Sequence, residues 1–158
     1  MKILVIVPCG KSKIWDKQPA IRSVKAEAAY TGAPFKANRD FAKKFADRWV
    51  ILSAKYGFID PDFIIPENYN VTFNDPSTNP ISLEKLKAQV EAKKLAQYDL
   101  VISLGGKEYT RRVKVCFAGK VRVISPVEGL PVGKAMGFIK NLTALEKPEM
   151  LNKISSIG

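Results

Sequence analysis

The stretch "ILVIVPCGKSK", residues 3–13, indicates the fold of this chain more clearly than any other. Ile3 to Val7 form an unbroken apolar run, so we expect a strand that is buried on both faces. Pro8 ends the run, and a cysteine, a glycine and two lysines follow it. Strands of this kind belong to parallel sheets, in which ligands bind beyond the carboxyl ends of the strands. The polar residues after Val7 are therefore the first candidates for a site.

The rest of the chain repeats this alternation of apolar runs with helical segments. Strands are predicted at residues 2–8, 49–53, 100–104 and 121–124, and helices at 34–47, 82–97, 107–117 and 131–145. Phe41 and Phe45 recur at helical spacing in the first helix, with Lys36 and Lys43 opposite them. Residues 57–81 are rich in proline and are predicted to be rich in loop. The expected fold is α/β: a three-layer, mainly parallel sheet of four or more strands with helices on both faces, in a single domain covering residues 1–158.

The chain is strongly basic. It carries 26 Lys plus Arg against 15 Asp plus Glu, a formal net charge of +11. The excess lies in residues 1–60 and 101–158, whereas residues 61–100 are slightly acidic. A charge of this size favours a polyanionic partner, which is a nucleic acid (DNA or tRNA) or the phosphate of a nucleotide. Lysines that only keep the surface solvated are the simpler alternative.

The chain has no histidine. This excludes Ser-His-Asp and Cys-His nucleophilic sites and any metal site that needs imidazole, and two cysteines are too few for a structural zinc site of the usual kind. We therefore expect no metal and no cofactor. Any catalysis must use Lys, Asp, Glu, Tyr, Ser or Cys side chains.

The sequence also bears on location and on the state of the thiols. No apolar run is long enough to span a bilayer, and the start of the chain lacks the long apolar region and cleavage site of a signal peptide. We expect no membrane association and a cytoplasmic protein. In that compartment Cys9 and Cys116 are expected to be free thiols. The oligomeric state is not indicated.

The first candidate site follows the first strand. The Gly-Lys-Ser of "CGKSK" is not a P-loop, because Val5 stands where that pattern needs its first glycine. Lys11 and Lys13 can still neutralise a phosphate, unless they are simply solvated. Cys9 is a candidate nucleophile beside two ammonium groups, or else a buried and inert thiol.

The second strand runs into "ILSAKYGFIDPD", residues 51–62. Ser53, Lys55 and Tyr56 form a polar cluster at its end, and Gly57 breaks the strand geometry. Lys55 is a candidate base or amine nucleophile. A salt bridge from Lys55 to Asp60 or Asp62 is the alternative.

The third strand runs into "LGGKEYTRR", residues 104–112. Gly105 and Gly106 leave backbone N–H groups and a helix N-terminus free to face an anion. Arg111 lies with Lys107 and Lys114 on one stripe of the helix that follows, which can track a nucleic-acid backbone or be a plain solvated face. Ser125–Gly129 follow the fourth strand, and the four segments should meet at one edge of the sheet.

The order of these motifs resembles a known family. "AYTGAPF" (29–35), "ILSAKYGFIDPDFIIPENYNVTF" (51–73) and "LGGKEY" (104–109) are similar to the pattern of YaaA-like proteins and their short bacterial, archaeal and phage relatives. The relatives share the Cys-x-Lys-x-Lys start and Ser-Ala-Lys-Tyr-Gly. "PCGKSK" with Tyr69-Asn70-Val71 is more faintly similar to the core domain of archaeosine synthase, from which Asn70 departs because that pattern has aspartate there.

The resemblance covers roughly residues 4–140 and implies association with DNA or tRNA, either as DNA binding under peroxide stress or as chemistry on a modified base. The site residues that it implies are Cys9, Lys11, Lys13, Tyr30, Ser53, Lys55, Tyr56, Gly57, Gly105, Glu108 and Tyr109.

Our hypothesis is a nucleic-acid-binding protein that acts on a nucleobase or its glycosidic bond, as a base-modifying, N-glycosylase or lyase enzyme. Lys55 or Lys11 would supply the amine or base, and Tyr56 and Tyr109 would stack on or hydrogen-bond the nucleobase. Lys13 with Gly105-Gly106 would hold phosphate. The alternatives are a non-catalytic DNA-binding stress-response protein and an enzyme acting on free nucleotides.

Overall fold

Strands and helices alternate along the chain, as the apolar runs predict. The computed structural model describes residues 1–157. Its strands are β1 (Ile3–Pro8), β2 (Val24–Lys25), β3 (Arg48–Ser53), β4 (Gly57–Ile59), β5 (Ile64–Ile65), β6 (Leu100–Ser103) and β7 (Val123–Ile124). Its α-helices are α1 (Ala26–Ala29), α2 (Ala33–Phe45), α3 (Leu83–Ala92), α4 (Lys107–Phe117), α5 (Val132–Thr143) and α6 (Lys147–Ser155).

The main sheet has five strands in the order β4-β3-β1-β6-β7. β1 lies at its centre and pairs in parallel with β3 on one side and β6 on the other, so that Val5 stands between Trp49 and Ile102. β7 extends the parallel part beyond β6, and β4 is antiparallel to β3. From β1 the chain first adds β3 and β4 on one side of β1, and it then crosses over to add β6 and β7 on the other side. This makes the gap between the carboxyl ends of β1 and β6 the topological switch point, where doubly wound folds bind ligands.

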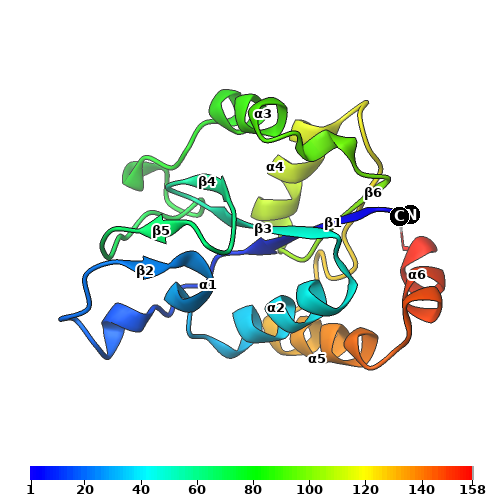
Figure 1. The fold of residues 1–158 in the computed structure, drawn as a ribbon, viewed down its shortest axis with the longest axis horizontal. Coiled ribbons are helices and arrows are strands. Elements are labelled where there is room, and N and C mark those ends of the chain that lie inside the picture. The colour runs from blue at the N-terminus through cyan, green and yellow to red at the C-terminus, as the bar shows by residue number, and fades with distance from the viewer. Residues whose placement is uncertain (158) are drawn as a thin grey trace.

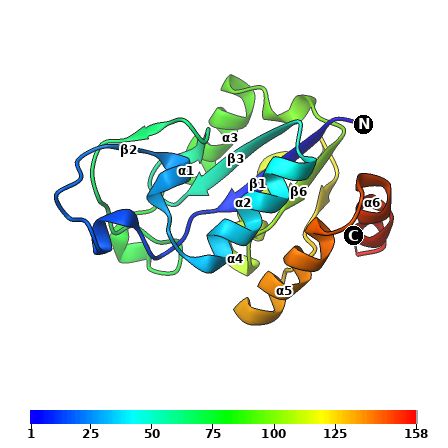
Figure 2. The same ribbon diagram turned by 60° about the horizontal axis from the view of Figure 1, so that its bottom comes forward.

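Helices cover both faces of this sheet. α2 and α5 lie on one face and α3 and α4 on the other (Figure 1), and in the turned view α2 lies in front of the strands (Figure 2). Along β1 the side chains of Ile3, Val5 and Val7 enter the core on the α2 side, whereas Leu4 and Ile6 enter the core on the α3 side. All five are buried, which explains the unbroken apolar run. The predicted three-layer α/β fold is confirmed.

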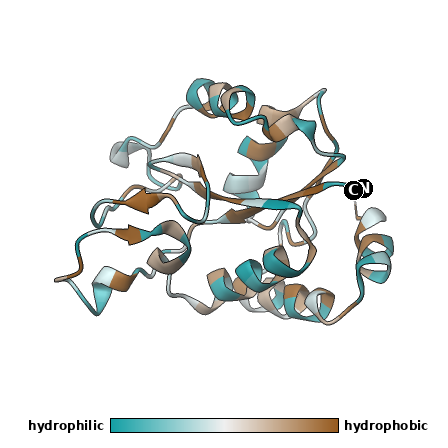
Figure 3. Cartoon of the chain, viewed as in Figure 1, coloured by the Kyte–Doolittle hydropathy of each residue, from teal (hydrophilic) through white to brown (hydrophobic). Residues whose placement is uncertain are grey.

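The distribution of hydrophobic residues agrees with this layered arrangement. Hydrophobic residues run along the strands, and the helices carry both hydrophobic and hydrophilic residues (Figure 3). On α2, for example, Phe41 and Phe45 are buried and Lys43 is exposed. No helix within residues 1–157 combines the length and the apolar composition needed to cross a membrane.

One expectation about the middle of the chain is confirmed and one is wrong. Residues 57–81 are rich in loop as predicted, and they also contain β4, which forms a hairpin with β3, and β5, whose Ile65 pairs with Val24 in β2 as a small antiparallel pair. The helix predicted over 82–97 ends at Ala92, since Lys94 adopts a left-handed φ of 56°. Strands of two or three residues are too short to show a period of their own, and nothing in the composition marks Lys94.

The C-terminal part holds one more difference. The sequence pattern predicts a helix over 131–145, and α5 is followed by a further helix, α6, that the pattern does not predict. Met150 and Ile154 of α6 are fully buried against the α2 side of the sheet. These two residues and the half-buried Leu151 are enough to dock a helix of nine residues but too few to define a periodicity.

Candidate functional site

A polar pocket of about 440 Å³ opens at the switch point. The loop after β1 forms one wall, a segment after β5 forms another, and α4 contributes one residue from the β6 side. Its lining residues are Cys9, Gly10, Lys11, Lys13, Tyr69, Asn70, Val71, Thr72, Asn74 and Tyr109. Two lysines line it and no aspartate or glutamate does, so the pocket is electropositive.

The loop after β1 is held by its backbone. The N–H of Cys9 donates to the carbonyl of Leu52 at 3.1 Å, and the N–H of Thr31 donates to the carbonyl of Ser12, also at 3.1 Å. The Lys13 ammonium lies 4.9 Å from the centre of the Tyr69 ring and donates to the carbonyl of Lys11 at 3.3 Å. These contacts fix the loop and the Lys13 side chain at the pocket wall.

Lys11 and Lys13 carry unneutralised charge. Within residues 1–157 neither ammonium forms a salt bridge with a carboxylate. Lys11 is exposed and Lys13 is half-buried. A cation without a carboxylate partner at a pocket wall is available to an anionic ligand.

Cys9 and Tyr109 meet across the switch point. Cys9 Sγ lies 3.2 Å from Tyr109 Oη, and a hydrogen bond of either direction fits this distance. A Cβ on Gly105 would come within 2.6 Å of the Tyr109 Cβ, so glycine there allows the tyrosine to pack against the end of β6. Both cysteines are free, and Cys9 is half-buried.

A cluster of hydroxyl groups lies below the pocket. The hydroxyls of Tyr30 and Tyr69 are hydrogen-bonded to each other, and Tyr69 Oη lies 2.9 Å from Ser53 Oγ. Ser53 Oγ also accepts the backbone N–H groups of Lys55 at 3.2 Å and Tyr56 at 3.1 Å. The three hydroxyls come from the ends of β3, α1 and the segment after β5, so the cluster ties these elements together.

The phenols of the site are neutral at neutral pH. Burial is the largest cause that raises the pKa of Tyr30, Tyr69 and Tyr109 above the ordinary value. The negative charge that Cys9 would carry as a thiolate raises all three further. A raised pKa keeps each phenol protonated, so the tyrosines here act as hydrogen-bond donors and not as bases.

The turn after β3 brings Lys55 close to the cluster but not into the pocket wall. Lys55 is exposed, with its ammonium 5.4 Å from the Tyr56 ring centre and 5.8 Å from that of Tyr69. Within residues 1–157 Lys55 forms no salt bridge with Asp60 or with Asp62, and Asp60 pairs with Arg48 at 3.1 Å. Lys55 therefore stands beside the pocket as a free cation in the described part of the chain.

Other predicted residues lie outside the pocket. Glu108 forms salt bridges with Arg111 at 3.1 Å and Arg112 at 3.2 Å, and hydrogen bonds from these arginines hold the pKa of its carboxyl below the usual range. Gly106 lines a separate, largely apolar pocket of about 150 Å³, together with Val127 from the segment after β7. The ends of β1, β6 and β7 thus serve two pockets, whereas Ser53–Gly57 at the end of β3 lines neither.

The segment Tyr69–Asn74 is the part of the site that sequence reasoning largely missed. Tyr69, Val71 and Phe73 turn inward, whereas Asn70 and Asn74 are exposed. Phe73 packs edge-on against Tyr109, with ring centres 5.3 Å apart. The alternation of apolar and polar residues between two prolines was the signal that could have found this wall.

The Phe73 ring has a second neighbour that was not predicted. The guanidinium of Arg112 lies 4.0 Å from its centre, and Arg112 also donates to the backbone carbonyl of Glu108. Arg112 is therefore a packing residue that fixes the wall segment to α4.

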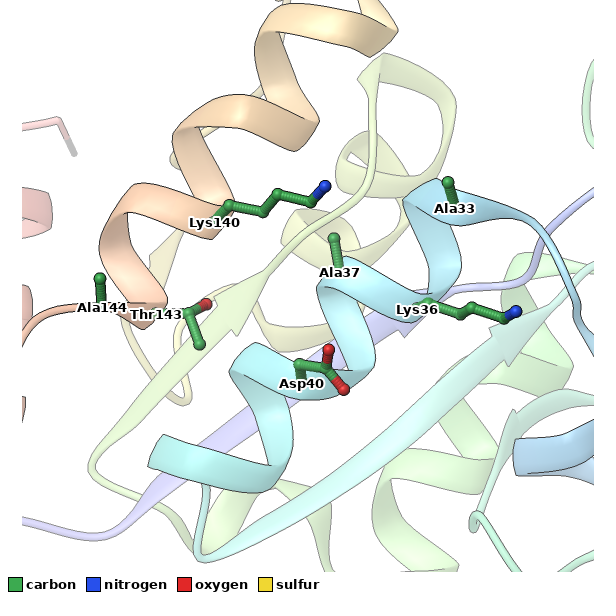
Figure 4. Close-up of a pocket in the computed structure, with 7 residues that line it drawn as sticks. All are labelled: Ala33, Lys36, Ala37, Asp40, Lys140, Thr143 and Ala144. Carbon is green, nitrogen blue, oxygen red and sulfur yellow. The ribbon is translucent and has the colours of Figure 1, made fainter.

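The described residues contain no group of three His, Cys, Asp or Glu side chains that could hold a metal ion. An open groove of about 450 Å³ lies between α2 and α5, lined by Lys36, Asp40 and Lys140 among others (Figure 4). None of the residues predicted for the site lines that groove.

The fold and the site define a doubly wound α/β protein with an electropositive pocket at its switch point. The chain belongs to a family of unknown function, DUF6884, whose model matches residues 4–141. The uncharacterized protein YfjM of Bacillus subtilis (strain 168) is 44% identical over 109 residues, which is 69% of this chain and 73% of YfjM.

One solved structure is similar in outline. It is described as a crystal structure of AF0587, a protein of unknown function, and it matches with a TM-score of 0.43 and 10% sequence identity. The match covers 91% of this chain and 45% of AF0587, so the chain spans less than half of that protein. None of these names states an activity.

Proposed function

We propose that this protein binds nucleic acid and seats one unpaired nucleotide in the pocket at the switch point. The observation that carries the proposal is the pocket's charge: Lys11 and Lys13 line it without carboxylate partners, and no acidic residue lines it. Ammonium groups in this setting bind phosphate. The formal net charge of +11 gives the whole molecule the same preference.

The size and lining of the pocket support a nucleotide rather than a bare phosphate. Its volume of about 440 Å³ falls within the range of pockets for small organic ligands. Tyr69 and Tyr109 offer aromatic surface and neutral phenols to a base, which is the usual way to bind unpaired nucleotides. An enclosed site of this kind takes a single-stranded or flipped-out base and not a paired one.

We further propose chemistry on the base or its glycosidic bond, with Lys11 supplying the amine. Lys11 lines the pocket, whereas Lys55 stands beside it, so Lys11 is the better placed of the two predicted lysines. Neutral phenols can donate hydrogen bonds to a departing base. The resemblance to YaaA-like proteins supports a DNA partner, and the fainter one to archaeosine synthase supports a base as the target. We also propose that the protein is cytoplasmic.

The test is fluorescence anisotropy with a labelled single-stranded oligonucleotide of about 16 nucleotides, its duplex and a tRNA. We expect the single strand to bind most tightly, because only it can fill the pocket without opening base pairs. The logarithm of its affinity should fall linearly with the logarithm of the salt concentration between about 50 and 200 mM. A mononucleotide added as competitor shows how much of the affinity for the oligonucleotide comes from a single nucleotide and how much from the rest of the strand.

Each outcome decides between the proposals. No binding of any of the three probes at low salt would overturn nucleic-acid binding. A mononucleotide that binds as tightly as the strand would point to an enzyme on free nucleotides. Incubation of the best binder should release a free or altered base, and Lys11→Ala should abolish that release; binding without release favours a non-catalytic DNA-binding protein.

A further inference from the structure

The hydroxyl cluster below the pocket has a definite donor and acceptor order. A serine or tyrosine hydroxyl has one proton to donate and two lone pairs to accept with. Ser53 Oγ accepts two backbone N–H groups, those of Lys55 and Tyr56. Its lone pairs are then filled, so its proton is donated to Tyr69 Oη, 2.9 Å away.

Tyr30 must donate in the same direction. Its side chain is 1% exposed, and its hydroxyl is hydrogen-bonded to Tyr69, whereas Ser53 Oγ, the other hydroxyl near it, already has both lone pairs filled. If Tyr69 donated to Tyr30, the Tyr30 proton would be buried without an acceptor, which is costly. The satisfied arrangement has Tyr30 donating to Tyr69.

Tyr69 Oη therefore accepts two hydrogen bonds, and its own proton is left over. That proton cannot return to Ser53 or Tyr30, because both are already donors to the same oxygen. Tyr69 lines the pocket. The Cys9 thiol lines it too, but its hydrogen-bond partner is the Tyr109 hydroxyl and not that of Tyr69. Tyr69 is 8% exposed and lines the pocket, so we take the pocket as the side toward which its free proton lies.

We infer that the Tyr69 hydroxyl is a hydrogen-bond donor of the pocket, oriented by Tyr30 and Ser53, and that the ligand places an oxygen acceptor on it. Burial keeps the phenol protonated by raising its pKa, so the donor persists through neutral pH. Lys11 and Lys13 add further donors to the same pocket. The ligand is thus rich in oxygen acceptors, either a base carbonyl or a phosphate; the choice of nucleic acid as its carrier rests on the proposed function.

The test compares two variants that differ only at the inferred donor. Tyr30→Phe removes one bond to Tyr69 but leaves Ser53 donating to it and the Tyr69 proton free for the ligand. Tyr30→Phe/Tyr69→Phe removes the donor while keeping both rings. We expect Tyr30→Phe, which loses one of the two bonds that orient Tyr69, to bind oligo-dT about threefold more weakly than the wild type, and the double variant to bind about tenfold more weakly than Tyr30→Phe.

A second oligonucleotide, oligo-dA, identifies which oxygen of the ligand accepts the hydrogen bond from Tyr69. Thymine carries carbonyl oxygens and adenine carries none, so a loss confined to oligo-dT assigns the acceptor to the base, and an equal loss on oligo-dA assigns it to phosphate. Unchanged affinity of the double variant for both strands, with weaker binding by Lys11→Ala/Lys13→Ala, would overturn the inference and leave the proposed function standing.

A readout without ligand covers the cases in which the wild type binds neither strand or the double variant fails to fold. In NMR spectra of wild-type protein with labelled tyrosines, the Tyr30 hydroxyl proton should exchange slowly with water and the Tyr69 proton rapidly. Slow exchange at Tyr69 with rapid exchange at Tyr30 would reverse the donor order and overturn the inference.

Discussion

Replacing Lys11 and Lys13 together by alanine is expected to weaken single-stranded DNA binding by about 100-fold at low salt. Both ammonium groups line the pocket, and neither is neutralised by a carboxylate in the described residues. Each is expected to contact phosphate, so the salt dependence of the affinity should also become shallower, by about 1.4 in the log–log slope. Anisotropy titrations over a salt series measure both quantities.

The matched control removes the same charge elsewhere. Lys36→Ala/Lys140→Ala takes two lysines from the groove between α2 and α5 (Figure 4) and leaves the pocket intact. We expect its affinity to stay within about threefold of the wild type, since the loss of two surface charges is largely screened. Equal weakening by the two double variants would mean that net charge, and not the pocket, holds the nucleic acid.

Gly57→Ala is expected to lower the free energy of unfolding by about 3 kcal/mol. Gly57 has a φ of +78°, where a side chain is strained, and an added Cβ would lie 2.2 Å from Gln89 Oε1. Gln89 accepts the N–H of Phe58 at 2.8 Å and donates to the carbonyl of Tyr56 at 3.0 Å, so the clash breaks the clamp on the turn after β3. Urea unfolding followed by circular dichroism measures the loss.

A second glycine provides the control for this prediction. An added Cβ at Gly137, inside α5, would meet no atom within 4 Å. Gly137→Ala should therefore stabilise the protein by about 0.5–1 kcal/mol through helix propensity. A Gly57→Ala protein that unfolds at the wild-type urea concentration would show that the turn does not depend on glycine.

The main sheet could be predicted from the sequence because burial on both faces leaves an unmistakable mark. Ile3 to Val7 and Leu100 to Leu104 face two cores at once, so every position is apolar or small. β2 and β5 leave no such mark: they are two residues long, and Ile64 in β5 is exposed. Their pairing depends on tertiary contacts that local patterns do not contain.

The site could be predicted only in part, for a related reason. Parallel strands place their carboxyl ends at one edge, so Cys9, Lys11, Lys13 and Tyr109 were found by their positions after strands. Which gap is the switch point depends on the strand order, and the sequence does not state that order. The wall Tyr69–Asn74 follows no strand of the main sheet, so the same reasoning could not reach it.

The roles of individual residues were the hardest to foresee. Lys55 stood out in the sequence, but the turn at Gly57 leaves it beside the pocket. Glu108 and Arg111 form a salt bridge with each other and so satisfy their charges away from the pocket wall. Tyr69 gains its importance from two buried hydroxyls that lie far from it in sequence.

The measurement that tests the central claim most directly is a titration of ¹⁵N-labelled protein with single-stranded oligo-dT, followed by amide chemical shifts. The pocket at the switch point predicts that the largest changes fall on Cys9–Lys13, Tyr69–Asn74 and Tyr109. Changes confined to the exposed face of α4 around Arg111 and Lys114, with the pocket amides unmoved, would contradict it. In that case the strand would bind a basic surface, and the pocket would have no part in holding it.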